Sequence, residues 1–118
     1  MNRQITCLAA CLATGFAAPV AAQTYPVKPI RFVIGFTPGG GSDIVGRLVG
    51  QKMIESMGQQ IIYDNRPGAG GNIAAELVTR AAPDGYTIYL AQIAAVAISP
   101  GLYAKLPYDP VRDFAAST

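Results

Sequence analysis

Apolar residues in this chain gather in three short runs of strand character, separated by stretches that are rich in glycine, proline and polar residues. The first run, residues 30–36, is β-branched and aromatic and almost continuously apolar, which is typical of a strand buried on both faces. Residues 60–64 and 86–91 form two further runs of the same kind. The pattern therefore predicts three β-strands.

Between these strands the apolar residues recur at helical spacing. In the first interval Ile44 and Leu48 stand one turn apart, and Gly58 is well placed to end the helix. An adjoining apolar stripe of the same helix consists of Val45, Val49, Met53 and Met57. A second helix follows the glycine cluster at residues 65–72, and its expected apolar face consists of Ile73, Leu77, Val78 and Ala81. In an amphipathic helix such a stripe faces the core.

The predicted order, β-loop-α-β-loop-α-β, belongs to the α/β class and implies a parallel sheet with right-handed crossovers. In an open parallel sheet the carboxyl ends of the strands lie along one edge, and ligands bind in the crevice there. Three connections leave that edge, at residues 37–43, 64–72 and 92–99. We therefore expect both glycine clusters to lie at the same edge of the sheet.

Residues 1–22 have the pattern of a secretory signal. Arg3 precedes an apolar stretch at residues 5–18, Pro19 follows, and small residues lead to a predicted cleavage after Ala22. The stretch is shorter than the roughly 20 apolar residues of a membrane-spanning helix. Residues 8–11 resemble the lipobox of a lipoprotein signal, although little apolar sequence precedes Cys11, and a lipoprotein signal stays as an alternative.

Composition narrows the possible functions. A chain of 118 residues with 51% apolar residues is one domain at most and is not a disordered tail. It contains no histidine, and this excludes catalytic triads that use histidine and metal sites that use histidine ligands within the chain. Removal of residues 1–22 takes away both cysteines, Cys7 and Cys11, and leaves 96 residues without a disulfide or a reactive thiol. A net charge of +2 is too small to indicate nucleic-acid binding. We expect no catalytic residues, no metal and no cofactor.

Glycine-rich loops between a strand and a helix expose backbone N–H groups beside the positive end of the helix, and so they can bind an anion. The structural alternative is a tight turn that needs glycine for its backbone geometry. Two such loops at one sheet edge favour the anion site. The expected contacts in the first loop are Thr37, Pro38, Gly39, Gly40, Gly41 and Ser42. Those in the second loop are Pro67, Gly68, Ala69, Gly70, Gly71 and Asn72.

The details of the two loops argue against a nucleotide. In the first loop Gly41 stands where a phosphate-binding P-loop has its lysine. The second loop has Ile73 where a dinucleotide fingerprint needs its last glycine. Asp64 could still mimic the acidic residue that binds a ribose, so a Rossmann-like nucleotide-binding enzyme remains the alternative from another class.

A carboxylate suits the two loops better, because a few N–H groups and hydroxyls satisfy its single charge. Thr37, Ser42 and Asn72 can donate hydrogen bonds, and Asn72 could instead cap the second helix. Asp43 is expected to interact with the start of the first helix rather than with a ligand. Arg66 could pair either with an acidic ligand or with Asp64.

At these loops the chain resembles a known family, the extracytoplasmic solute receptors of tripartite tricarboxylate transporters, also called Bug receptors. The resemblance runs from about Tyr25 to Phe114. Its motifs are residues 25–26 (YP), 36–43 (FTPGGGSD), 65–74 (NRPGAGGNIA), 83–87 (PDGYT) and 106–114 (LPYDPVRDF). Each motif alone is weak, but five in the same order and spacing are specific.

The resemblance implies a periplasmic binding protein of type II, which has two lobes and is not an enzyme. It implies that the first two loops hold the carboxylate of a small solute, partly through ordered water, and that the solute passes to a cognate membrane permease. We expect a monomer. The third connection differs from the family's usual pattern, because residues 93–97 are apolar.

Members of this family are considerably longer than the chain. Residues 23–118 are therefore interpreted as the N-terminal part of the first lobe, without the second lobe, in a fragment or truncated gene product. A non-functional remnant of such a receptor is the alternative.

Overall fold

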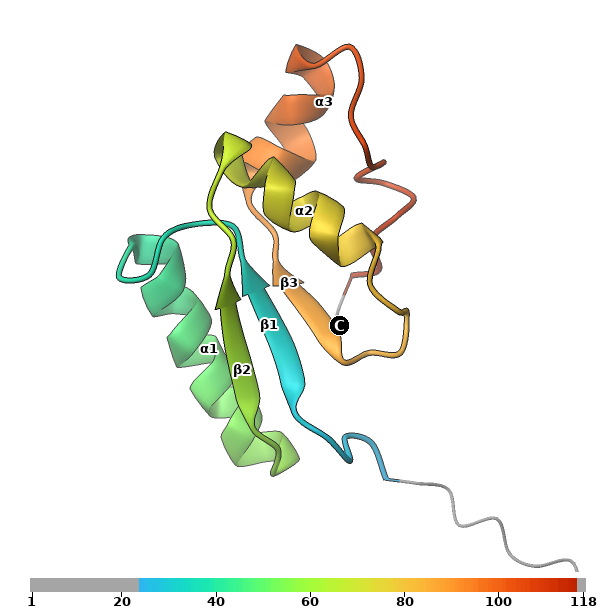
Figure 1. Ribbon diagram of the computed structural model, residues 1–118. Coiled ribbons are helices and arrows are strands. Elements are labelled where there is room, and N and C mark those ends of the chain that lie inside the picture. The colour runs from blue at the N-terminus through green and yellow to red at the C-terminus, as the bar shows by residue number, and fades with distance from the viewer. Residues whose placement is uncertain (1–23, 117–118) are drawn as a thin grey trace, which may run out of the picture.

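The computed structural model describes residues 24–116 as a parallel β-sheet with helices on both faces (Figure 1). The strands are β1 (Ile30–Ile34), β2 (Ile61–Asn65) and β3 (Thr87–Leu90). The helical elements are α1 (Gly41–Met57), η1 (Ala69–Gly71), α2 (Asn72–Thr79), η2 (Ala94–Ile98) and α3 (Ser99–Leu102). The predicted alternation of strands and helices is confirmed. The predicted signal, residues 1–22, lies outside the described residues.

The central strand is β1, which pairs in parallel with β2 on one side and with β3 on the other. Ile30, Phe32, Val33 and Ile34 are all buried. This burial explains the continuous apolar run in the sequence, because both faces of a central parallel strand are covered.

Side chains alternate between the two faces of the sheet. Phe32 and its neighbours in register, Tyr63 and Ile88, lie on the face that α1 covers. Tyr89 lies on the opposite face, where it packs with Ala75 of α2. The order β2-β1-β3 thus places α1 and α2 on opposite faces (Figure 1).

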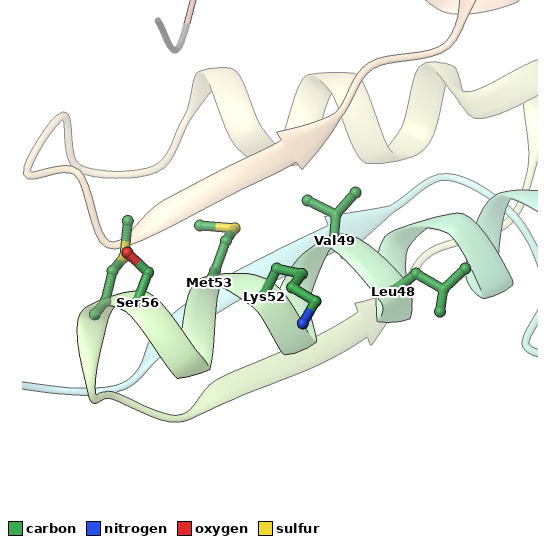
Figure 2. Close-up of a pocket in the computed structure, with 6 residues that line it drawn as sticks. Leu48, Val49, Lys52, Met53 and Ser56 are labelled. Carbon is green, nitrogen blue, oxygen red and sulfur yellow. The ribbon is translucent and has the colours of Figure 1, made fainter.

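Helix α1 departs from the usual amphipathic arrangement, in which the apolar stripe faces the core. Its apolar stripe lies mostly outward: Leu48 is 61% exposed and Val49 45% exposed. These side chains line an apolar groove of about 460 Å³ along the outer side of the helix (Figure 2). The sheet-facing side contains Gly46 and Gly50 instead.

The two glycines explain this orientation. A Cβ atom at Gly46 would lie 2.7 Å from Ile34 Cδ1, and one at Gly50 would overlap the ring of Tyr63. Because no side chain intervenes, the helix backbone lies close to the sheet, and the apolar stripe is turned away from it. The predicted end of the helix is confirmed: Gly58 takes the left-handed conformation, with a φ of 68°, and its N–H bonds the Ile54 carbonyl at 2.9 Å.

The apolar face expected for α2 also needs correction. In α2 the small residues Ala74 and Ala75 face the core, whereas Ile73 is 50% exposed. The third connection contains helix: residues 94–98 form a π-helical turn that continues into α3. Small residues favour this compact arrangement, since Ala95 packs in the core with Ala75 and Tyr108.

Candidate functional site

Both glycine loops lie at the carboxyl edge of the sheet, as the topology predicted. The first loop joins β1 to α1, and the second joins β2 to α2 (Figure 1). The exposed residues of the predicted set are Thr37, Pro38, Gly39, Gly41, Pro67, Gly68, Ala69 and Gly70. Gly40 and Ser42 are half-buried, and Gly71 and Asn72 are buried. Most of the predicted set therefore forms an accessible surface beside the starts of two helices.

The first loop is held in shape by the buried carboxylate of Asp43. Its Oδ2 accepts hydrogen bonds from Arg47 Nε at 2.9 Å and from the Gly39 N–H at 3.0 Å. Its Oδ1 accepts one from Asn65 Nδ2 at 3.0 Å. These hydrogen bonds, of which the one from Arg47 has the largest effect, hold the pKa of Asp43 well below its usual range. As expected, Asp43 serves the start of α1, and its lone pairs are used within the protein.

The start of α1 offers backbone donors to the crevice. Gly40 is the N-cap residue and has no side chain, and its carbonyl accepts the Ile44 N–H at 3.0 Å. The N–H groups of the first turn, including those of Gly41 and Ser42, have no acceptor within a helix. Arg47 compensates the charge of Asp43, so the first turn keeps its ability to attract an anion.

The second loop turns through three glycines with positive φ, Gly68, Gly70 and Gly71. Gly71 is the N-cap of α2, so Asn72 does not cap the helix. Instead Asn72 Oδ1 accepts hydrogen bonds from Ser99 Oγ and the Tyr108 hydroxyl, both at 2.8 Å. Because the oxygen is engaged, the Nδ2 group is the part of this amide that can donate to a ligand.

The two charged residues at the end of β2 pair within the protein. Arg66 Nε donates to Asp64 Oδ1 at 2.7 Å, and Arg31 Nε donates to Oδ2 at 2.8 Å. Burial by itself raises the pKa of Asp64, but the hydrogen bonds from both arginines outweigh it and lower the pKa. Asp64 thus has two guanidinium partners and is not a free ribose acceptor. Of the two roles predicted for Arg66, pairing with an acidic ligand or with Asp64, the structure shows the pairing with Asp64.

Sequence reasoning missed three residues near this edge: Asn65, Tyr108 and Gln92. Asn65 Nδ2 links β2 to the first loop, because it also donates to the Phe36 carbonyl at 3.0 Å. Gln92 comes two residues after β3, and its side-chain amide is buried. A polar residue directly after a parallel strand lies at the carboxyl edge, and this signal was available in the sequence.

Tyr89 and Tyr108 belong to the packed support of the second loop rather than to its exposed surface. The Tyr89 hydroxyl donates to the Gly71 carbonyl at 3.3 Å, and burial raises its pKa to about 12. Burial also raises the pKa of Tyr108. Both phenols therefore stay protonated at neutral pH and act as hydrogen-bond donors.

Residues 24–116 hold no cluster of three or more histidine, cysteine, aspartate or glutamate side chains that could bind a metal ion. In the same range no helix is long and apolar enough to cross a membrane.

An open parallel α/β sheet with two anion-attracting loops at its carboxyl edge defines a class, the ligand-binding lobes of α/β proteins. Within that class, residues 45–117 match the family model of the tripartite tricarboxylate transporter family receptor. The chain belongs to this family, as its motifs predicted. Since the family consists of receptors, the expectation that the chain is not an enzyme is confirmed, and the Rossmann-like alternative is wrong.

Curated relatives agree with this assignment. The chain is 37% identical over 115 residues to protein BugT of Bordetella pertussis, covering 96% of this chain and 35% of BugT. It is 44% identical over 108 residues to the UPF0065 protein in the gbd 5' region of Cupriavidus necator, covering 89% and 32% of the two chains. The chain thus spans about a third of the length of the curated relatives it matches.

Solved structures share the fold. The periplasmic binding protein BugD superposes with a TM-score of 0.72 at 38% identity, over 76% of this chain and 30% of BugD. MatC from Rhodopseudomonas palustris, with bound malate, gives 0.72 at 39% identity, over 76% and 31%. Rpa4515 of the same species, with adipate, gives 0.70 at 36% identity, over 74% and 29%. The predicted fold class, part of the first lobe of a periplasmic binding protein, is confirmed.

Proposed function

We propose that this chain forms the carboxylate-contacting part of a periplasmic solute receptor, which captures a small carboxylate for a membrane permease. One observation carries the proposal: two glycine loops, each leading into a helix, leave the carboxyl edge of the sheet from the neighbouring strands β1 and β2. Asp43 fixes the first loop and Asn72 the second through hydrogen bonds within the protein. Backbone N–H groups and the Asn72 Nδ2 group remain as donors for a ligand.

The family and the bound ligands of its relatives support a carboxylate rather than a phosphate. MatC and Rpa4515 hold malate and adipate, which are small dicarboxylates. In this chain the first loop has Gly41 where a phosphate site would have a lysine. Backbone N–H groups and one amide are sufficient for a singly charged carboxylate group.

Affinity follows from how much of the ligand the chain can enclose. Two-lobed binding proteins close around a ligand and bury most of its surface. This chain spans about a third of the length of its relatives and offers one binding surface, the carboxyl edge of its sheet. A carboxylate bound there keeps much of its hydration. We expect millimolar binding, about −4 kcal/mol, and a monomeric chain.

The localisation is tested by expressing the full 118-residue chain with its own N-terminal segment in a Gram-negative host. We expect the purified protein in the periplasmic fraction, with a mass that corresponds to cleavage after Ala22. Uncleaved protein in the cytoplasm would contradict the exported receptor.

Binding is tested by titrating the same purified protein with succinate, malate, adipate, NAD and ATP while its backbone amides are followed by NMR. The receptor predicts millimolar binding of at least one dicarboxylate. Selective binding of NAD or ATP would overturn it. A folded protein that responds to no carboxylate would support the non-functional remnant instead.

A further inference from the structure

The segment that precedes β1 is fastened to the turn that precedes β3. The Tyr25 hydroxyl donates to the Gly85 carbonyl at 2.6 Å, and the Val27 N–H donates to the Tyr86 hydroxyl at 2.9 Å. The rings of Tyr25 and Tyr86 pack with their centroids 5.1 Å apart. The two joined segments, which we call the N-terminal clasp, are residues 25–28 and residues 84–86.

An ion pair closes the end of the clasp nearer to β1. Lys28 Nζ lies 3.2 Å from Asp84 Oδ2 and 4.3 Å from the centre of the Tyr86 ring. Asp84 Oδ1 accepts the Tyr86 N–H at 3.0 Å, and the Tyr86 carbonyl accepts the Arg31 N–H of β1 at 2.8 Å. The side-chain contacts are exposed and individually weak, but together they hold the clasp against the sheet.

The clasp stands close in sequence to the predicted cleavage site, which itself lies outside the described residues. Cleavage after Ala22 leaves Gln23 and Thr24 between the cut bond and Tyr25. Two extended residues span about 7 Å. A peptidase binds its substrate as an extended strand on both sides of the bond that it cuts, and such a strand is longer than this spacer. With the clasp closed, the chain from Tyr25 onward is held against the fold rather than free to enter a peptidase cleft.

The clasp joins parts of the chain that are far apart in sequence. Tyr25 and Gly85 are 60 positions apart, and Lys28 and Asp84 are 56 apart. During export the residues next to the signal emerge before residues 84–86, so the clasp cannot close until the later segment has followed and β3 has paired with β1. The cleavage site is thus accessible before the clasp closes and shielded afterwards.

On the basis of the proposed export, we infer that the N-terminal clasp is a conformational gate on processing, which shields the bond after Ala22 from the signal peptidase once the chain has folded. The signal is therefore removed from the unfolded chain, and folding follows. A precursor that folds before cleavage keeps its apolar segment, residues 5–18, and is not released as a receptor.

The decisive experiment compares two folded proteins, the full 118-residue chain and a variant with a Gly-Ser linker of about 10 residues between Thr24 and Tyr25. The linker leaves the clasp and both sides of the cleaved bond unchanged but moves them roughly 17 Å apart. Signal peptidase in detergent should cleave the linker variant after Ala22 about tenfold faster. Equal rates would overturn the inference and leave the proposed export standing. If neither protein is cleaved after Ala22, the proposed export fails, and the gate fails with it.

A second variant opens the clasp without altering the residues beside the cleaved bond. Tyr86→Phe removes the hydroxyl that accepts the Val27 N–H, and the folded precursor should be cleaved about fivefold faster, because cleavage proceeds through the opened clasp. The matched control is Tyr103→Phe, since Tyr103 is 51% exposed and lies outside the clasp. Amide spectra recorded before the peptidase is added show that each protein is folded. A folded Tyr86→Phe precursor that is cleaved at the rate of the parent would overturn the gate.

Discussion

The Tyr108 hydroxyl donates a hydrogen bond of 2.8 Å to Asn72 Oδ1 and so connects the second glycine loop to a segment 36 residues further along the chain. The same hydroxyl lies 2.7 Å from the Ala95 carbonyl, and Ser99 Oγ donates to Asn72 from the third connection. Two segments, the third connection and the one that contains Tyr108, thus converge on the Asn72 amide. The position of the second loop depends on this buried polar cluster.

Removing the Tyr108 hydroxyl should therefore weaken the fold. In Tyr108→Phe, Asn72 Oδ1 and the Ala95 carbonyl lose a buried donor, and we expect the free energy of unfolding to fall by about 1–3 kcal/mol. Urea denaturation measures the change. The control is Tyr103→Phe, because Tyr103 is 51% exposed and should lose little. Equal effects in the two variants would show that the cluster does not stabilise the second loop.

Asn72→Asp tests the donor role of Asn72 in the site. The carboxylate can still accept hydrogen bonds from Ser99 and Tyr108, but it lacks the NH₂ donor and repels an anionic ligand. We expect the affinity for succinate to fall by a factor of ten or more, on the order of 1.4 kcal/mol. Gln51→Glu adds the same charge on an exposed position of α1 and should leave binding unchanged. Succinate binding by Asn72→Asp equal to that of the unaltered chain would remove Asn72 from the site.

The strands and the edge that carries the loops could be predicted from the sequence, because β1 is buried on both faces and a buried central strand leaves a continuous apolar run. The side of α1 that packs on the sheet could not be predicted in this way. Helical periodicity identifies an apolar stripe but does not show that Gly46 and Gly50 bring the backbone against Ile34 and Tyr63. The relation between Asn72 and Tyr108 was equally invisible, because it depends on how segments far apart in the chain pack.

The close packing of α1 predicts that alanine at Gly46 destabilises the protein. Alanine favours a helix by about 1 kcal/mol over glycine, but its Cβ would lie 2.7 Å from Ile34 Cδ1. We expect the steric cost to exceed the helix preference, with a net loss of about 1–2 kcal/mol in thermal unfolding. Gly101 in α3 is the control, since a Cβ there meets nothing within 4 Å. A Gly46→Ala variant that is more stable than the parent would contradict the observed facing of α1.

Stability should decrease in acid. The pKa values of Asp43, Asp64, Asp84 and Asp113 are all lowered in the folded chain. A carboxyl whose pKa is lower in the folded state stabilises the fold above its unfolded pKa, near 4, and that stability is lost as the pH falls. We expect the free energy of unfolding to decrease from about pH 5 downward.

Asp43→Asn isolates the contribution of the first loop to this acid response. The variant should be less stable than the parent at neutral pH, because the amide cannot accept all three hydrogen bonds, and the difference should shrink toward about pH 2. Urea denaturation across this range measures both curves. Parallel curves for the two proteins would show that Asp43 is not the group responsible.

The central claim is that the two glycine loops together form one carboxylate site. Backbone amide shifts recorded by NMR during titration with succinate, and separately with the uncharged succinamide, test it most directly. The account predicts that amides in both loops, including Gly39, Gly41, Gly68 and Gly70, shift with a common millimolar midpoint for succinate and not for succinamide. Shifts in only one loop, shifts of equal size with succinamide, or no shifts in either loop would contradict it.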